Sequence, residues 1–162
     1  MKLAKIFLPI AVVSLLAMVV IMWITFAMGA IVPDVEGGGA EALGAGIAAM
    51  FGALFIIIIN VVATLLFSGF ALGIFICWIC VFKSRKKFNA LTGAFVLSCL
   101  IFPLVLVAAI ITALVYVATS PIGAVVVLLG FAFFLAAFIG VCVAFGKANA
   151  LRKKEGLEGG EA

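Results

Sequence analysis

The residues best suited to chemistry in this chain are two cysteines, Cys77 and Cys80, in the stretch CWICVFKSRKK. Residues three apart share one face of a helix, so the two thiols could act as a redox pair or bind a soft metal ion. Positive charge at Lys83 and Arg85 would favour the reactive thiolate. A lone pair of this spacing is a weak signal, because free cysteine is also a common buried apolar residue. We therefore expect Cys77 and Cys80 to serve packing, with thiol redox chemistry or soft-metal binding as the alternative.

Other groups that carry chemistry are scarce. The 162 residues include no histidine, which removes the usual general base and the commonest metal ligand. The other two cysteines, Cys99 and Cys142, lie in apolar segments, and the sequence holds no paired carboxylates, Ser–His arrangement or phosphate-binding glycine loop. We expect a protein that is not an enzyme and that binds no cofactor, no metal and no nucleic acid.

The composition indicates that most of the chain is solvated by lipid. Hydrophobic residues make up 69% of the sequence and charged residues 10%, whereas about 25% of the residues in a soluble domain are charged. The mean hydropathy is +1.57, and a soluble chain of this length could not bury so much apolar surface. We predict an all-α integral membrane protein, an antiparallel bundle of four transmembrane helices, in a plasma (inner) membrane.

Charged residues divide the chain into apolar runs, and a spanning helix needs about 20 apolar residues. The first run predicts a span over residues 6–32. Its core, Ile6–Phe26, is longer than that of a signal peptide. We therefore expect this segment to remain as an anchor, whereas cleavage would leave three spans.

The last run is divided by Thr119-Ser120-Pro121. Ser120 is a favoured N-cap residue and Pro121 fits the first position of a helix. This pattern predicts two antiparallel spans, over residues 89–118 and 121–146, joined by a very tight turn.

The middle run, Gly44 to Phe82, is too long for one span. With one span, every Lys and Arg falls on one side of the membrane; with two, the basic residues after Phe82 move to the side opposite the N-terminus. The positive-inside rule favours one span, over residues 58–82, with both termini in the cytoplasm. We expect these basic residues to fix the orientation and to contact anionic lipid headgroups: Lys83, Arg85, Lys86, Lys87, Lys147, Arg152, Lys153 and Lys154.

Residues 42–57 then form a helical extension on the outer side. Two arrangements are open: a helix that lies along the outer leaflet or packs on the bundle, and a protruding part of one long helix. Its bulky residues recur at helical spacing: Leu43, Ile47, Met50, Phe51 and Leu54. The glycine-rich stretch Pro33 to Gly44 predicts a flexible external connection. Residues 1–152 form the membrane domain, and the charged residues 153–162 predict a disordered tail.

Small residues mark two candidate packing faces, because they let helix backbones approach closely in lipid. Gly69 and Gly73 form a GxxxG motif in the second span. In the fourth span a small residue stands at every fourth position: Ala132, Ala136, Gly140, Ala144 and Ala148. We expect internal packing of the bundle, with a homo- or hetero-oligomer interface as the alternative.

The predicted spans contain no acidic or basic residue, the usual mark of an ion or proton pathway. We therefore predict a small non-catalytic membrane protein that acts as an accessory or interaction subunit. Two alternatives remain: a small oligomeric channel, permease or pore-former, and a membrane thiol redox or soft-metal-binding protein that uses Cys77 and Cys80.

Overall fold

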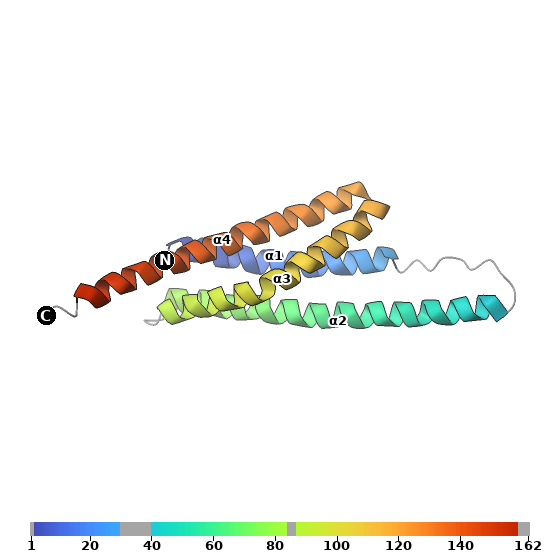
Figure 1. Ribbon diagram of the computed structural model, residues 1–162, viewed down its shortest axis with the longest axis horizontal. Helices are drawn as coiled ribbons and strands as arrows, with labels where there is room; N and C mark the ends of the chain where they lie inside the picture. The colour runs from blue at the N-terminus through green and yellow to red at the C-terminus, as the bar shows by residue number, and fades with distance from the viewer. Residues whose placement is uncertain (1, 30–39, 84–86, 159–162) are drawn as a thin grey trace.

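The computed structural model describes residues 2–29, 40–83 and 87–158, which form four α-helices (Figure 1). The helices are α1 (Lys2–Gly29), α2 (Ala40–Lys83), α3 (Lys87–Thr119) and α4 (Pro121–Glu158). No strand occurs among these residues. Each helix holds a segment long and apolar enough to cross a membrane. The predicted all-α bundle of four membrane-spanning helices is confirmed, and the chain is an integral membrane protein.

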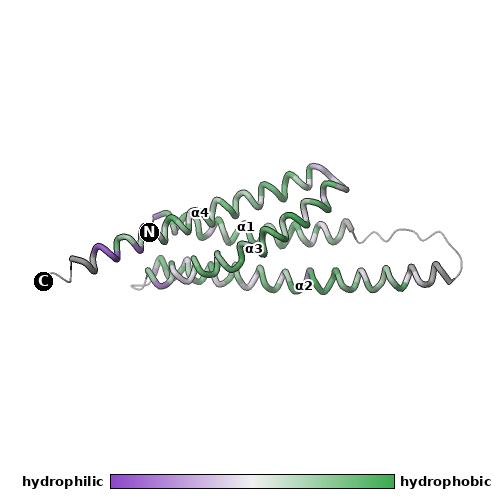
Figure 2. Tube along the Cα trace, viewed as in Figure 1, coloured by the Kyte–Doolittle hydropathy of each residue, from purple (hydrophilic) through white to green (hydrophobic). Residues whose placement is uncertain are grey.

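Successive helices run antiparallel and lie side by side in chain order (Figure 1). Helix α1 contacts the other three and α3 contacts α2 and α4, whereas α2 and α4 do not meet within the described residues. The start of α1, the end of α2, the start of α3 and the end of α4 therefore share one end of the bundle. Hydrophilic residues gather at this end, most visibly along the last part of α4 (Figure 2). We call it the basic end.

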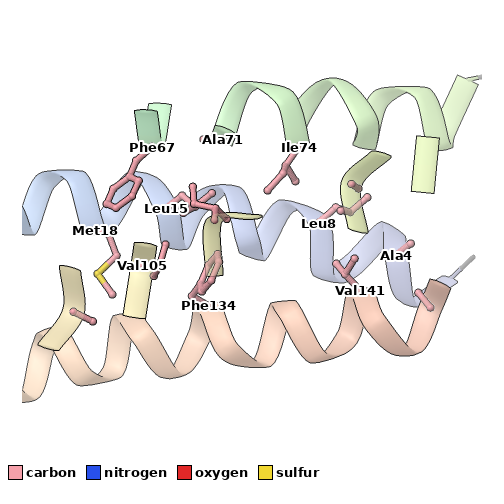
Figure 3. Close-up of a cluster of buried hydrophobic side chains, with 14 of the residues drawn as sticks. Ala4, Leu8, Leu15, Met18, Phe67, Ala71, Ile74, Val105, Phe134 and Val141 are labelled. Carbon is pink, nitrogen blue, oxygen red and sulfur yellow. The ribbon is translucent and has the colours of Figure 1, made fainter. Parts of the chain in front are cut away.

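Apolar side chains from all four helices fill the core (Figure 3). Leu8, Leu15, Ile74, Val105 and Phe134 are at most 1% exposed. Buried positions recur every seven residues, as in these three sets: Phe67, Ile74 and Val81; Leu91, Ser98 and Val105; Val127, Phe134 and Val141. This period is typical of helices that cross at a small angle with interlocking side chains.

Helix α2 is longer than its neighbours at the end away from the basic residues (Figure 1). The indole N–H of Trp23 donates a hydrogen bond of 2.7 Å to the hydroxyl of Thr64, which sets the register of α1 against α2. Gly29, the last residue of α1, lies six residues after Trp23. In the antiparallel register it is level with Ile58, which lies six residues before Thr64. Residues 40–57 of α2 thus extend past α1 by about 27 Å, at the helical rise per residue. We call residues 40–57 the overhang.

The overhang is a straight continuation of the span that begins at Ile58, one of the two arrangements expected. It does not pack on the bundle, because its bulky side chains lie above the end of α1 and stay 49–75% exposed: Ile47, Met50, Phe51 and Leu54. The connecting segment is shorter than expected, since α2 already begins at Ala40 and residues 40–44 are helical. The helix-favouring run Ala-Glu-Ala-Leu explains this early start. The rest of the stretch from Pro33, and residues 30–32 of the first predicted span, lie outside the described residues.

A single residue, Ser120, separates α3 from α4. Its N–H donates to the carbonyl of Tyr116 at 2.6 Å, and its own carbonyl accepts the N–H of Ala124 at 3.3 Å. Ser120 thus occupies the predicted N-cap position, with Pro121 as the first helical residue. The prediction of a disordered tail from residue 153 is wrong for residues 153–158, because α4 continues to Glu158. Residues 148–154, Ala-Asn-Ala-Leu-Arg-Lys-Lys, are mostly strong helix formers. They therefore extend a helix that is already nucleated.

Candidate functional site

The two cysteines of the CxxC motif lie near the basic end of α2, half-buried and free. The thiol of Cys77 faces α3, where a Cβ added to Gly93 would stand 3.5 Å from its Sγ. No group of three or more His, Cys, Asp or Glu side chains gathers around them in the part of the chain that the structure describes. The motif therefore contributes a helix–helix contact, and its two thiols stand without further ligands there.

Trp78, between the two cysteines, joins α2 to α1. Its indole N–H donates to the backbone carbonyl of Lys5 at 3.2 Å. Its ring packs against Phe75 and Phe82 with centroid distances of 5.6 and 5.3 Å, and the ammonium of Lys5 lies 4.3 Å from the ring centroid of Phe82. The CxxC segment thus contacts α3 through Cys77 and α1 through Trp78.

The basic end also has a second cation–π contact, in addition to that of Lys5 with Phe82. The guanidinium of Arg152 lies 4.9 Å from the ring centroid of Phe88, and Phe145 stacks between Phe88 and Phe95 at 5.9 and 4.5 Å. The other described basic residues predicted to contact headgroups are all exposed at this end: Lys83, Lys87, Lys147, Lys153 and Lys154. Arg85 and Lys86 lie outside the described residues. The cations of this end thus sit on all four helices, since Lys2 and Lys5 belong to α1.

Cys99 and Cys142 lie opposite each other on facing helices, which their spacing in the sequence did not indicate. Phe95 stacks on Phe145 and Phe102 stacks on Phe138, at 4.5 and 4.7 Å. Because Cys99 lies between the two α3 rings and Cys142 between the two α4 rings, the cysteines sit at the same height on facing helices. Both are free thiols. Their positions are 43 residues apart in the sequence, so only the register of α3 against α4 could have revealed them.

The small residues of α4 do not share one face. Gly140 and Ala144 are buried, whereas Ala132 and Ala136 are exposed. A step of four residues overshoots a helical turn by about 40°, so a stripe with this period winds out of the contact. Gly140 marks the closest approach, because a Cβ added there would collide with the ring of Phe7 on α1.

The GxxxG motif of α2 divides in the same way. A Cβ added to Gly73 would lie 3.1 Å from the side chain of Leu97 on α3, whereas Gly69 is exposed and faces open space. Only the second glycine of the motif therefore lies at a contact within the described bundle.

Several hydroxyls in the spans are hydrogen-bonded within their own helix. Hydroxyls of Ser14, Thr25, Thr92 and Thr112 donate to the carbonyl four residues earlier, at 2.6–3.0 Å. Ser98 differs, since its hydroxyl is buried and has no hydrogen-bond partner among the described residues. The interior therefore offers little that could coordinate an ion.

A polar ladder joins α1 to α2 near the start of the overhang. The indole of Trp23 donates to Thr64, the hydroxyl of Thr64 donates to the Asn60 carbonyl, and the amide of Asn60 donates to the Ile56 carbonyl, at 2.7, 2.7 and 3.0 Å. Asn60 is 9% exposed. The ladder satisfies polar groups where α1 ends.

An open groove of about 380 Å³ lies between α1 and α4. Its wall is apolar and includes Pro9, Val13, Gly130 and Phe133. Among the described lining residues, the one hydroxyl, that of Ser14, already donates to the carbonyl of Ile10. The groove is therefore as apolar as a lipid acyl chain, and none of its described lining residues presents a free hydroxyl.

Helix α2 presents the least covered surface of the molecule. Only 11% of its most apolar window is buried, against 28% in each of the other three helices. The exposed surface runs from the overhang down the side of α2 that faces away from the core. The uncovered surface of α2 and the basic end are therefore two features that packing within the bundle does not explain.

Comparison of the chain with protein-family models, with curated proteins and with solved structures finds no match.

Proposed function

We propose that this chain is a non-catalytic membrane protein that acts by binding another membrane protein chain, as an accessory or interaction subunit. The observation that carries the proposal is the uncovered surface of α2. An exposed apolar surface much larger than a few hundred Å² is typical of interaction sites. In the membrane such a surface is solvated by lipid, but the overhang rises beyond the length that the hydrocarbon core can cover.

The packed interior supports an interaction role over transport through a single bundle. Large side chains close the core at successive levels, from Leu8 through Leu15 on α1 to Phe134 and Val127 on α4. The hydroxyls near this core mostly donate to their own helix. A permeation route would therefore have to form between chains.

We further propose that the basic end lies in the cytoplasm of the cell and rests on anionic headgroups of the inner membrane. The support is the collection of Lys and Arg at one end of all four helices, which the positive-inside rule assigns to the cytoplasm. Cysteines placed one at a time at Lys2 and at Ile122, in a chain without native cysteines, test this orientation. A membrane-impermeant maleimide added to intact cells should label Ile122→Cys only, and labelling of Lys2→Cys instead would reverse the orientation.

The interaction role is tested by extraction of the tagged protein in native lipid nanodiscs. We expect a complex of fixed stoichiometry that contains at least one further protein chain, of this or another sequence. A variant with Ile47, Met50 and Leu54 changed to Ala should lose that chain, whereas a control with the exposed Ile110, Leu114 and Val117 of α3 changed to Ala should keep it. Recovery of a single chain per nanodisc at native expression would contradict the role.

A further inference from the structure

The overhang exposes large apolar side chains over most of its circumference. Ile47, Met50 and Leu54 lie on one side and are 49–75% exposed. A Cβ added to Gly52, on the opposite side, would meet nothing within 4 Å, and Phe55, about 60° from Gly52 around the helix, is 64% exposed. Contact with water is therefore unfavourable for most of the overhang.

The side of the overhang that carries Ile47, Met50 and Leu54 continues along α2. Exposed large side chains follow at spacings of three, four or seven residues and are 42–75% exposed: Ile47, Met50, Leu54, Ile58, Val61, Leu65 and Leu72. These seven residues point away from the core side of α2, which carries Phe67 and Ile74. We call them the outward face. It is one continuous stripe that begins beyond the hydrocarbon core and ends within it.

Lipid does not provide a satisfactory cover for this face at the level of the overhang. The apolar core of α1, Ile6–Phe26, matches a hydrocarbon thickness of about 30 Å without tilt, and α2 lies beside it in register. A helix that lies in the interface has a strongly polar or charged side, but no charged residue occurs between Glu41 and Lys83. Helix α2 also runs unbroken through Gly52, so it does not turn toward the membrane surface.

We propose that the outward face binds the outward face of a second copy of this chain, in a parallel two-fold dimer. In two copies inserted with the same orientation, the overhangs project to the same height on the same side of the membrane. Equivalent residues then meet across a two-fold axis along the membrane normal, as a closed dimer requires. The proposal deepens the interaction role proposed above by naming the bound chain.

The size of the outward face fits a stable dimer. Seven large side chains that are about half exposed offer on the order of 700 Å² per protomer, close to the roughly 800 Å² per partner of a standard interface. The hydrophobic effect drives association of the overhangs in water, while close packing must hold the part in lipid. The helix spacing of the stripe suits two helices that pack side by side over a long contact.

Disulfide crosslinking of the pure protein in phosphatidylcholine–phosphatidylglycerol vesicles tests the dimer. The four native cysteines are changed to Ala, and Leu54→Cys is compared with Gly52→Cys, which lies about 200° around the helix at the same height. Under mild oxidation, Leu54→Cys should shift from the 16.8 kDa monomer band to a band of twice that mass. Gly52→Cys should remain monomeric, and Met50→Cys should repeat the result of Leu54→Cys if one variant folds poorly.

Three results would overturn the dimer: equal crosslinking of Leu54→Cys and Gly52→Cys, which indicates random collision; crosslinking of Gly52→Cys alone; and no crosslinking of Leu54→Cys or Met50→Cys in protein that elutes as a folded species. In the last case, a fluorophore on Leu54→Cys that is quenched by brominated lipid would show that lipid covers the overhang. Because the vesicles hold no other protein, this failure leaves the interaction role to the nanodisc experiment, where a different chain would sustain it.

Discussion

The close approach of α1 and α4 at Gly140 makes the sharpest test of the bundle. Replacement by Ala would place a methyl group against the ring of Phe7. Overpacking of this kind typically destabilises by about 1–3 kcal/mol, but Ala also favours the helix over Gly by about 1 kcal/mol. The two effects oppose each other, so Gly140→Ala alone should show a modest net loss.

Gly69→Ala supplies the matched control, because a Cβ there meets nothing within 4 Å. Both variants gain the same helix propensity, so the difference between their free energies of unfolding isolates the overpacking of about 1–3 kcal/mol. The measurement is reversible unfolding in mixed SDS micelles, followed by the fluorescence of Trp23 and Trp78. Equal stability of Gly140→Ala and Gly69→Ala would refute the contact.

A second substitution tests the identity of the neighbour. Phe7→Leu shortens the side chain that the new methyl group meets, and we expect it to cost less in the Gly140→Ala background than in the native one. Contacting residues commonly show coupling energies of about 0.5–3 kcal/mol in such double-mutant cycles. Additive costs would place the ring of Phe7 elsewhere.

Three further predictions use the same unfolding measurement. Gly123→Ala should be about 1–3 kcal/mol less stable than Gly69→Ala, because the ring of Tyr116 fills the space of the added Cβ; equal stability of the two variants would argue against the α3–α4 turn described above. Ser98→Ala should be neutral or stabilise by up to about 1 kcal/mol, since its buried hydroxyl lacks a partner among the described residues; a loss of stability would reveal a partner. Trp23→Phe should cost about 0.5–1.5 kcal/mol by removing the donor to Thr64, and Thr64→Val should abolish that cost in the double variant.

The topology followed from the sequence because it depends on quantities that the sequence contains. The distance between charged residues bounds each span, and the distribution of Lys and Arg separates four spans from five. Ser120 and Pro121 identified the turn between α3 and α4 by local backbone preference alone. None of these inferences required knowledge of which helix faces which.

The candidate site was harder to predict because it depends on the rotation of each helix about its own axis and on its register against the neighbouring helices. Trp78 lies beside the basic residues, where tryptophan often anchors a helix at the membrane interface, yet its indole also donates to the carbonyl of Lys5, 73 residues away. The stripe through Ala132 and Gly140 was read with a period of four, whereas the buried residues of α4 recur every seven. Every apolar residue in a span is suited to lipid and to the core alike, so hydrophobicity cannot mark the inner face as it does in a soluble helix.

The single residue between α3 and α4 has a consequence for how the chain enters the membrane. No charged residue occurs between Lys87 and Lys147, so α3 and α4 can cross as one hairpin without carrying any charge through the hydrocarbon. In the proposed orientation the first two helices differ, because Asp34, Glu36 and Glu41 are then translocated together with the overhang. With both termini in the cytoplasm, as proposed, insertion of the first two helices translocates a substantial segment, whereas insertion of the last two translocates almost none.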